Sequence, residues 1–167
     1  GNGAGNSFNS ITNNTIGNDT NGVLLYTTSA GYLSYVNSNT VGNNTCSNAT
    51  NACYEVQGAN SASVQNSNSF LNNTAFNATY GFYLTTPGTM SGNTFYNNTL
   101  STITSYGVYF ATSNTYYNDF SNSNTFNGYT FYHYYNWQNL TVSGLNIDAR
   151  SVPTRNYATN LGLFDMV

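Results

Sequence analysis

The densest chemical signal in this sequence is the N-glycosylation motif Asn-x-Thr, which occurs eight times, always with threonine at the third position. The motif asparagines are Asn13, Asn18, Asn43, Asn48, Asn72, Asn77, Asn97 and Asn139. Six of them form pairs five residues apart, and an N-linked glycan is a bulky, solubilising group that needs a surface position. The pattern predicts a surface that carries covalent N-linked glycans.

The same asparagines have a competing structural interpretation. Stacked asparagine side chains bond to one another through their amides, and an asparagine buried in such a ladder cannot carry a glycan. Asn118 holds a ladder-like position without a sequon, which favours a structural role for the first sequon of each copy: Asn13, Asn43, Asn72 and Asn97. The better glycan sites are then the second sequons: Asn18, Asn48 and Asn77. Stacking and glycosylation can coexist.

The two cysteines, Cys46 and Cys53, lie close together in the sequence. A metal site there would lack ligands, because no histidine lies nearby. A local disulfide between them is the better interpretation, and it implies an oxidising compartment.

The ionisable residues give little support for catalysis. The acidic side chains are dispersed, one to a region: Asp19, Glu55, Asp119, Asp148 and Asp165. A glycosidase needs two facing carboxylates, and Asp19 and Glu55 are the candidates that could approach each other across neighbouring coils. A lyase of the calcium-dependent kind needs clustered acids and a basic residue, and lysine is absent. We therefore expect no enzymatic activity, no metal and no cofactor.

An aromatic run around His133 is the remaining candidate site. Tyr132, Tyr134 and Trp137 could form a sugar-stacking platform, because flat rings bind the apolar faces of sugars. The alternative is a capping coil whose inner face packs against the core. A single histidine among aromatic rings is more often a packed residue than a ligand.

Composition restricts the partners and the compartment. Charged residues are 4% of the chain, against about 25% in an ordinary soluble domain. The only cations are Arg150 and Arg155, so the chain lacks the charge needed to hold a nucleic acid. No apolar run of about 20 residues is present for membrane insertion. The 16 Tyr and 10 Phe, in register with a repeat, indicate an ordered fold.

An internal repeat sets the elements that must position these residues. The segment 72–79 (NNTAFNAT) has copies that start at residues 13, 43, 72 and 97, in steps of 30, 29 and 25. A period of this length marks a solenoid. Short runs such as 32–36 alternate as strands do, Asn, Gly and Ser mark the turns, and helix-forming runs are absent.

Aligning the copies produces two apolar columns. The first contains Ile11, Val41, Phe70, Phe95 and Tyr116. The second contains Val23, Cys53, Phe82, Val108 and Thr130. Their steps shorten together toward the C-terminus, as happens when loops shrink while strands stay stacked. With about three short strands per coil, the sequence predicts an all-β parallel β-helix of about five to six coils.

One copy also resembles a known family. The run Asn-Thr-Phe-Tyr-Asn-Asn-Thr (93–99) followed by Tyr-Gly-Val-Tyr-Phe (106–110) resembles the right-handed β-helix repeats of pectin-lyase-like proteins. It is most similar to the N-x-F-x-N-N…G-I-x-L repeats of periplasmic copper-enzyme maturation proteins and archaeal extracellular surface proteins. The resemblance covers roughly residues 10–147 and implies a right-handed parallel β-helix. It implies no function, and the family's lyase residues have no counterparts here.

These patterns divide the chain into three parts. Residues 1–10 are glycine-rich and form a flexible tail or part of an incomplete first coil, and residues 11–147 are the β-helix repeats. In residues 148–167 the pattern stops. The apolar end, 161–167, either caps its own core or docks on a neighbouring subunit by β-augmentation.

The expected function follows from the ends of such a fold. A β-helix ends in unpaired strand edges, and head-to-tail contacts between unlike ends propagate into filaments when the rotation between subunits does not close. We therefore expect a secreted, N-glycosylated structural subunit of an extracellular filament or cell-surface sheath, archaeal in origin, that assembles with itself end to end. The alternative is a carbohydrate-binding adhesin or spike with an exposed Tyr/Trp face.

Overall fold

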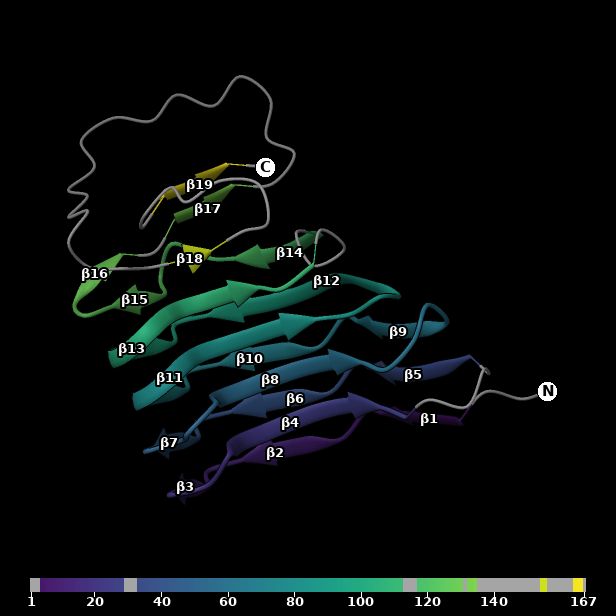
Figure 1. Cartoon of the computed structure of the whole chain (residues 1–167), viewed down its shortest axis with the longest axis horizontal. Coiled ribbons are helices and arrows are strands. Elements are labelled where there is room, and N and C mark those ends of the chain that lie inside the picture. Colours follow the sequence, from purple (N-terminus) through teal and green to yellow (C-terminus); the bar gives the residue numbers. More distant parts are fainter. Residues whose placement is uncertain are drawn as a thin grey trace.

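The chain is a β-solenoid of stacked parallel coils in the computed structural model (Figure 1). The structure describes residues 4–28, 33–112, 117–130, 132–134, 154–155 and 164–166. All elements in these ranges are strands, so the predicted all-β parallel solenoid is confirmed. A helix of the length and apolarity needed to span a membrane is not found in the described part of the chain.

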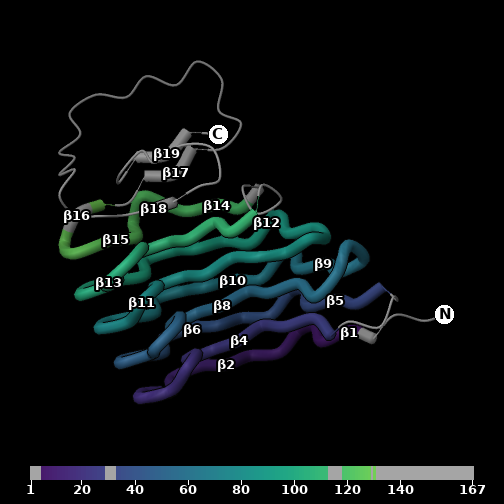
Figure 2. Tube along the Cα trace, in the orientation of Figure 1, coloured from purple at the N-terminus to yellow at the C-terminus, as the bar shows by residue number. Residues whose placement is uncertain are grey.

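Four coils and the start of a fifth follow one another along the axis (Figure 2). Coil 1 contains β1 (Ala4–Ser7), β2 (Ser10–Thr12), β3 (Thr15–Gly17) and β4 (Asn21–Thr27). Coil 2 contains β5 (Ser34–Asn37), β6 (Thr40–Gly42), β7 (Thr45–Ser47) and β8 (Ala52–Gly58). Coil 3 contains β9 (Ser63–Asn66), β10 (Ser69–Leu71) and β11 (Thr74–Thr85). Coil 4 contains β12 (Thr89–Tyr96) and β13 (Thr99–Phe110), and coil 5 begins with β14 (Tyr117–Phe120) and β15 (Thr125–Phe126).

Each full coil has four strand segments rather than the three expected from the sequence. They belong to two sheets of eight and nine strands. In coil 3 the last two segments merge into β11, which pairs first with β7 and then with β8. Several segments are only three residues long, too short for their alternation to be recognised in the sequence.

Three corners per coil turn the chain, and each holds a residue with positive φ. Corner 1 consists of Phe8, Ser38, Ser67 and Gly92. Corner 2 consists of Asn13, Asn43, Asn72 and Asn97. Corner 3 consists of Asn18, Asn48, Asn77, Thr102 and Asn127. Among residues with a side chain, asparagine adopts this left-handed conformation more readily than most, which explains why it predominates at corners 2 and 3.

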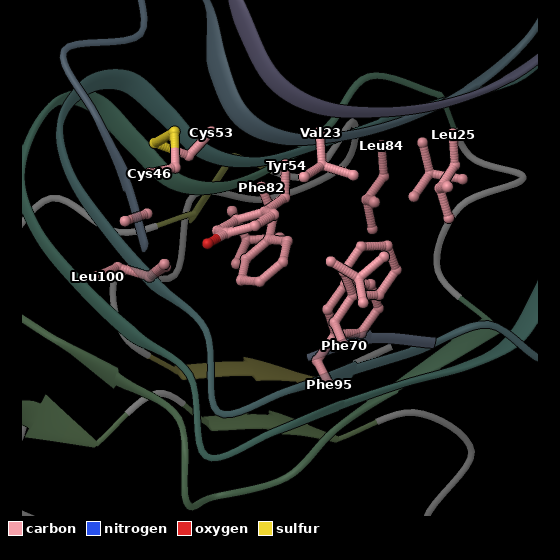
Figure 3. Packing of buried hydrophobic residues seen from close by; sticks show 14 of the residues in the cluster. Val23, Leu25, Cys46, Cys53, Tyr54, Phe70, Phe82, Leu84, Phe95 and Leu100 are labelled. Carbon is pink, nitrogen blue, oxygen red and sulfur yellow. A yellow bond between two sulfur atoms is a disulfide. The ribbon is translucent and has the colours of Figure 1, made fainter. Parts of the chain in front are cut away.

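The core is a row of rings and aliphatic side chains between the two sheets. One inward column contains Ile11, Val41, Phe70, Phe95 and Phe120. The ring centroids of Phe70 and Phe95 are 4.8 Å apart, and those of Phe95 and Phe120 are 4.0 Å apart. Phe82 from the other sheet meets Phe70 and Phe95 edge-on (Figure 3). Each such pair contributes about 0.5–1.5 kcal/mol beyond area burial.

The register corrects two members of the predicted columns. Phe120 continues the first column after the Phe95 position, where Tyr116 was expected; Tyr116 lies outside the described residues. In the second column Tyr54, not Cys53, pairs with Val23. The slip of one position arises because the residues between β3 and β4 differ in number from those between β7 and β8.

A hairpin follows β15, and it corrects a third residue of the predicted columns, Thr130. Thr130 was expected in the second column, but it lies in β16 (Tyr129–Thr130), antiparallel to β15. Asn127 and Gly128 form the two-residue turn, both with positive φ, as a type I′ turn requires. The place beside Val108 in the second column belongs instead to Thr154 of β18 (Thr154–Arg155).

The terminal segments pair within the chain where they are described. β1 pairs in parallel with β5, so the described part of residues 1–10 belongs to coil 1. At the other end, β18 pairs with β13, and β19 (Phe164–Met166) pairs with β17 (Tyr132–Tyr134). The rest of residues 148–167 lies outside the described ranges.

Candidate functional site: the asparagine corners

Two buried asparagine ladders run along the solenoid axis, each directly after a corner. The ladder after corner 1 contains Asn9, Asn39, Asn68, Asn93 and Asn118. The ladder after corner 2 contains Asn14, Asn44, Asn73, Asn98 and Asn124. From coil 2 onward these side chains are 0–3% exposed. The amides are therefore part of the core.

The rung around Asn73 illustrates how the buried amides are satisfied. The backbone N–H and the Nδ2 of Asn44 donate to Asn73 Oδ1 over 3.0 and 3.1 Å. Asn73 Nδ2 donates in turn to the Val41 carbonyl over 2.8 Å and to Asn98 Oδ1 over 3.1 Å. Both ends of the amide are thus paired, as buried polar groups require. The bonds between ladder side chains have one direction, from the Nδ2 of each asparagine to the Oδ1 of its counterpart in the next coil.

The first sequons of each copy do not form this ladder, which corrects the structural role expected for them. The four are exposed, with φ of 54–60°; they are Asn13, Asn43, Asn72 and Asn97. The residue that follows each of them enters the ladder instead. The expectation failed because Asn118 aligns with Asn93, in the ladder of the other corner.

The second sequons, Asn18, Asn48 and Asn77, are also exposed, at corner 3. Their side chains stack on the surface, with Asn48 Nδ2 donating to Asn18 Oδ1 over 3.1 Å and Asn77 Nδ2 to Asn48 Oδ1 over 2.6 Å. Asn97 Nδ2 donates likewise to Asn72 Oδ1 at corner 2, over 2.8 Å. Seven of the eight sequon asparagines are therefore accessible, and Asn139 lies outside the described residues.

The Asn-Asn-Thr sequence at corner 2 also has an explanation in the fold. Its first residue occupies the left-handed corner, its second enters the ladder, and its threonine opens a strand. The strand threonines pair in register from coil to coil: Thr15, Thr45, Thr74, Thr99 and Thr125. Corner 1 uses the same order, as in Gly92-Asn93-Thr94, without forming a sequon. Sequon density is thus partly a consequence of the solenoid.

The predicted disulfide between Cys46 and Cys53 is confirmed, with Cα atoms 5.5 Å apart. Cys46 occupies the inward column of Ile16 and Ala75, and Cys53 lies beside Gly22. A Cβ at Gly22 would be 2.6 Å from Cys46 Sγ, so only glycine leaves room for the bond. The link joins β7 to β8 behind corner 3 of coil 2.

The two carboxylates that could have formed a catalytic pair have different surroundings. Glu55 is 4% exposed, and Asn51 Nδ2 donates to its Oε2 over 3.1 Å. Burial raises the pKa of Glu55, while hydrogen bonds from Asn21 and Asn51 act in the opposite direction. Asp19 is exposed and accepts from the Thr20 N–H. The described residues contain no group of three His, Cys, Asp or Glu that could hold a metal.

A cluster of four tyrosines on the last segments of β11 and β13 was missed by the sequence analysis. Tyr80 and Tyr83 of β11 pair in register with Tyr106 and Tyr109 of β13. The Tyr80 and Tyr109 centroids are 5.1 Å apart with planes 14° from parallel. Burial, then the neighbouring Tyr109, raises the pKa of Tyr83. The repeated Tyr-Gly-x-Tyr motif was the available signal.

The predicted platform of Tyr132, Tyr134 and Trp137 is not tested, because only the backbone of residues 132–134 is described and Trp137 lies outside the described residues. The same holds for the side chain of His133. No protein-family model, curated protein or solved structure matches the chain. What the geometry defines is a class: a parallel β-solenoid with amide ladders inside two corners and accessible asparagines at two corners.

Proposed function

We propose that this chain is a structural subunit of an extracellular filament or cell-surface sheath, which assembles head to tail and carries N-linked glycans on its corner asparagines. The observation that carries the proposal is the one-sided pairing at the coil 1 end. Among the described strands, β1 and β4 pair only with β5 and β8, and β2 and β3 only with β6 and β7.

The coil 1 end also has a hollow and ladder acceptors that another chain could pair. A hollow of about 370 Å³ lies there, lined by Asn6, Asn9, Ile11, Leu24, Leu25, Tyr26, Val36 and Asn39. The Oδ1 atoms of Asn9 and Asn14, which begin the two ladders, accept no hydrogen bond from the described residues. Unpaired strand edges of this kind are templates for another chain.

The other end offers a continuation of one strand column. β18 extends the column of β4, β8, β11 and β13 in parallel orientation. A second copy displaced along the axis would place its own β4 next in that column. This contact joins unlike surfaces, and because the displacement is along the axis it does not close into a ring, so it repeats into a fibre.

The remaining parts of the proposal concern the surroundings of the protein. The disulfide fits an oxidising, extracellular compartment, and the exposed sequons fit a glycosylated surface. The resemblance to pectin-lyase-like repeats and to archaeal surface glycoproteins belongs to this proposal, as does a structural rather than catalytic role. None of these parts is needed for the end-to-end contact itself.

The assembly proposal is tested with a charge placed on the coil 1 end. Tyr26 lines the hollow and is 40% exposed, whereas Tyr96 is 54% exposed on coil 4, away from the hollow. Tyr26→Glu should abolish fibres in electron micrographs of purified protein, because it buries an unpaired charge in the contact. The matched variant Tyr96→Glu should assemble as the unmodified chain does. Equal assembly by both variants, or monomers of the unmodified chain, would refute the proposal.

A second candidate, a carbohydrate-binding module, is favoured by the tyrosine cluster. Its rings stack on one another, with Tyr106 and Tyr109 centroids 5.5 Å apart, so they offer mainly edges and hydroxyls to a ligand. Such groups suit the hydroxyls of a neutral oligosaccharide. Titration with chitohexaose should then show binding that Tyr106→Ala weakens and Tyr96→Ala does not. No heat of binding at millimolar sugar would exclude this ligand.

A further inference from the structure

We infer that a glycan on one corner asparagine excludes a glycan on the same corner of the adjacent coil, so that occupied sequons alternate along corners 2 and 3. This inference rests on the proposed glycosylation and adds a rule for which sites are filled together. It limits the folded protein to two glycans on each of the two corners, although the described sequons number four and three.

The rule starts from the spacing of the corner amides. Parallel strands of neighbouring coils lie about 4.8 Å apart, and the corner residues follow that spacing. Asn77 Nδ2 is 2.6 Å from Asn48 Oδ1, and Asn97 Nδ2 is 2.8 Å from Asn72 Oδ1. The amides of these adjacent pairs therefore stack directly over one another along the axis.

A single glycan fits this arrangement. The sugar is attached to Nδ2 and replaces one of its two hydrogens. The other hydrogen can still be donated to the Oδ1 of the corner asparagine in the preceding coil. The sequon asparagines are exposed and lie outside the core. A glycan on Asn72, for example, leaves the ladder intact, because the ladder bonds are made by the backbone N–H and side chain of Asn73.

Two glycans on adjacent coils do not fit. Their linkage nitrogens would be one strand spacing apart, about 4.8 Å, and both would leave the same corner in the same direction. A pyranose ring with its hydroxyls and their hydration is wider than that spacing. One sugar would have to displace the other or pull its asparagine out of the left-handed corner, where φ is fixed near 53–60° for the sequon residues.

The test compares two variants that each keep only two sequons. The adjacent variant keeps Asn72 and Asn97, the stacked pair of coils 3 and 4, and the separated variant keeps Asn43 and Asn97, in coils 2 and 4. Other corner sequons are removed by Asn→Gly, which tolerates positive φ as Gly92 does at corner 1, and Asn139 is replaced by Gln. Both variants are secreted from a eukaryotic host that glycosylates Asn-x-Thr.

The readout is the number of glycans on each intact, folded molecule, measured by mass spectrometry after size-exclusion chromatography. We expect at most one glycan on the adjacent variant and two on the separated variant. Two glycans on both would overturn the exclusion rule while leaving the proposed glycosylation standing. No glycan on either variant would overturn the proposed glycosylation of these corners and the rule with it.

Discussion

Asn72 and Asn73 are neighbours with the same side chain, yet the fold gives them opposite roles. Asn72 is exposed at corner 2 with φ of 55°, and no buried contact depends on its amide. Asn73 is 0% exposed and forms hydrogen bonds with residues of coils 2 and 4. The same contrast repeats in coils 2 and 4, with Asn43 beside Asn44 and Asn97 beside Asn98.

The comparison shows what each kind of asparagine does for the solenoid. The corner residue contributes a backbone conformation that glycine could also adopt. The ladder residue contributes amide groups that satisfy backbone atoms inside the turn, such as the Val41 carbonyl. Only the second role requires an asparagine side chain, and only the first leaves that side chain free for a glycan.

The largest loss of stability is expected from a substitution that breaks a ladder. Asn73→Ala removes the acceptor for Asn44 and the donor for the Val41 carbonyl, leaving at least two buried groups unpaired. Each unpaired group costs about 1–3 kcal/mol, so the free energy of unfolding should fall by about 3 kcal/mol or more. Urea unfolding followed by circular dichroism measures it. A loss below about 1 kcal/mol would show that the ladder is dispensable.

Removing the disulfide tests whether a corner can be held by amides alone. The double variant Cys46→Ala, Cys53→Ala opens a short loop, and the chain-entropy estimate for such a loop is about 2.5 kcal/mol. Coils 1 and 3 keep the same turn with Ile16 or Ala75 and no cross-link, so coil 2 should still form. Urea unfolding with and without dithiothreitol gives the comparison. If reductant left the unmodified chain equally stable, the link would have no stabilising role.

A smaller, pH-dependent effect on stability is expected at Glu55. The hydrogen bonds to its carboxylate offset only part of the effect of burial on its pKa. Because burial raises its folded pKa above the ordinary 4.5, its contribution to stability is complete below that value and is lost as pH rises through the folded pKa. Glu55→Gln keeps an acceptor for Asn51 and removes the titration. The variant should equal or exceed the unmodified chain in melting temperature at neutral pH, and lose that advantage in acid. A constant difference across pH would contradict this.

The smallest effect is expected from Asn72→Gly, the counterpart of Asn73→Ala. Glycine adopts positive φ without strain, and the exposed side chain bonds only at the surface, to Asn97 Nδ2. The stability should change by no more than about 0.5 kcal/mol, measured by the same urea titration on unglycosylated protein. A loss as large as that of Asn73→Ala would erase the proposed difference between corner and ladder.

The sequence analysis reached the architecture but misplaced side chains within it. The repeat steps of 30 and 29 are the separations of the hydrogen-bonded ladder residues Asn14, Asn44 and Asn73. The disulfide was also predictable, because two nearby cysteines without histidine leave few alternatives. The prediction for the second column was wrong at Cys53, because the link before β8 is one residue longer than the link before β4. A shift of one residue in a strand changes which side chain faces inward.

The sequence by itself determined the repeat, the all-β class and the pairing of the cysteines, because these depend on periodicity and on proximity along the chain. The tertiary structure alone decided which asparagine of each Asn-Asn pair is buried, since that choice is made by the left-handed corner and the neighbouring coils. It also brought together Tyr80 and Tyr109, 29 residues apart, as well as Glu55 and Tyr83. These contacts exist only because loops of unequal length still allow the coils to stack in register.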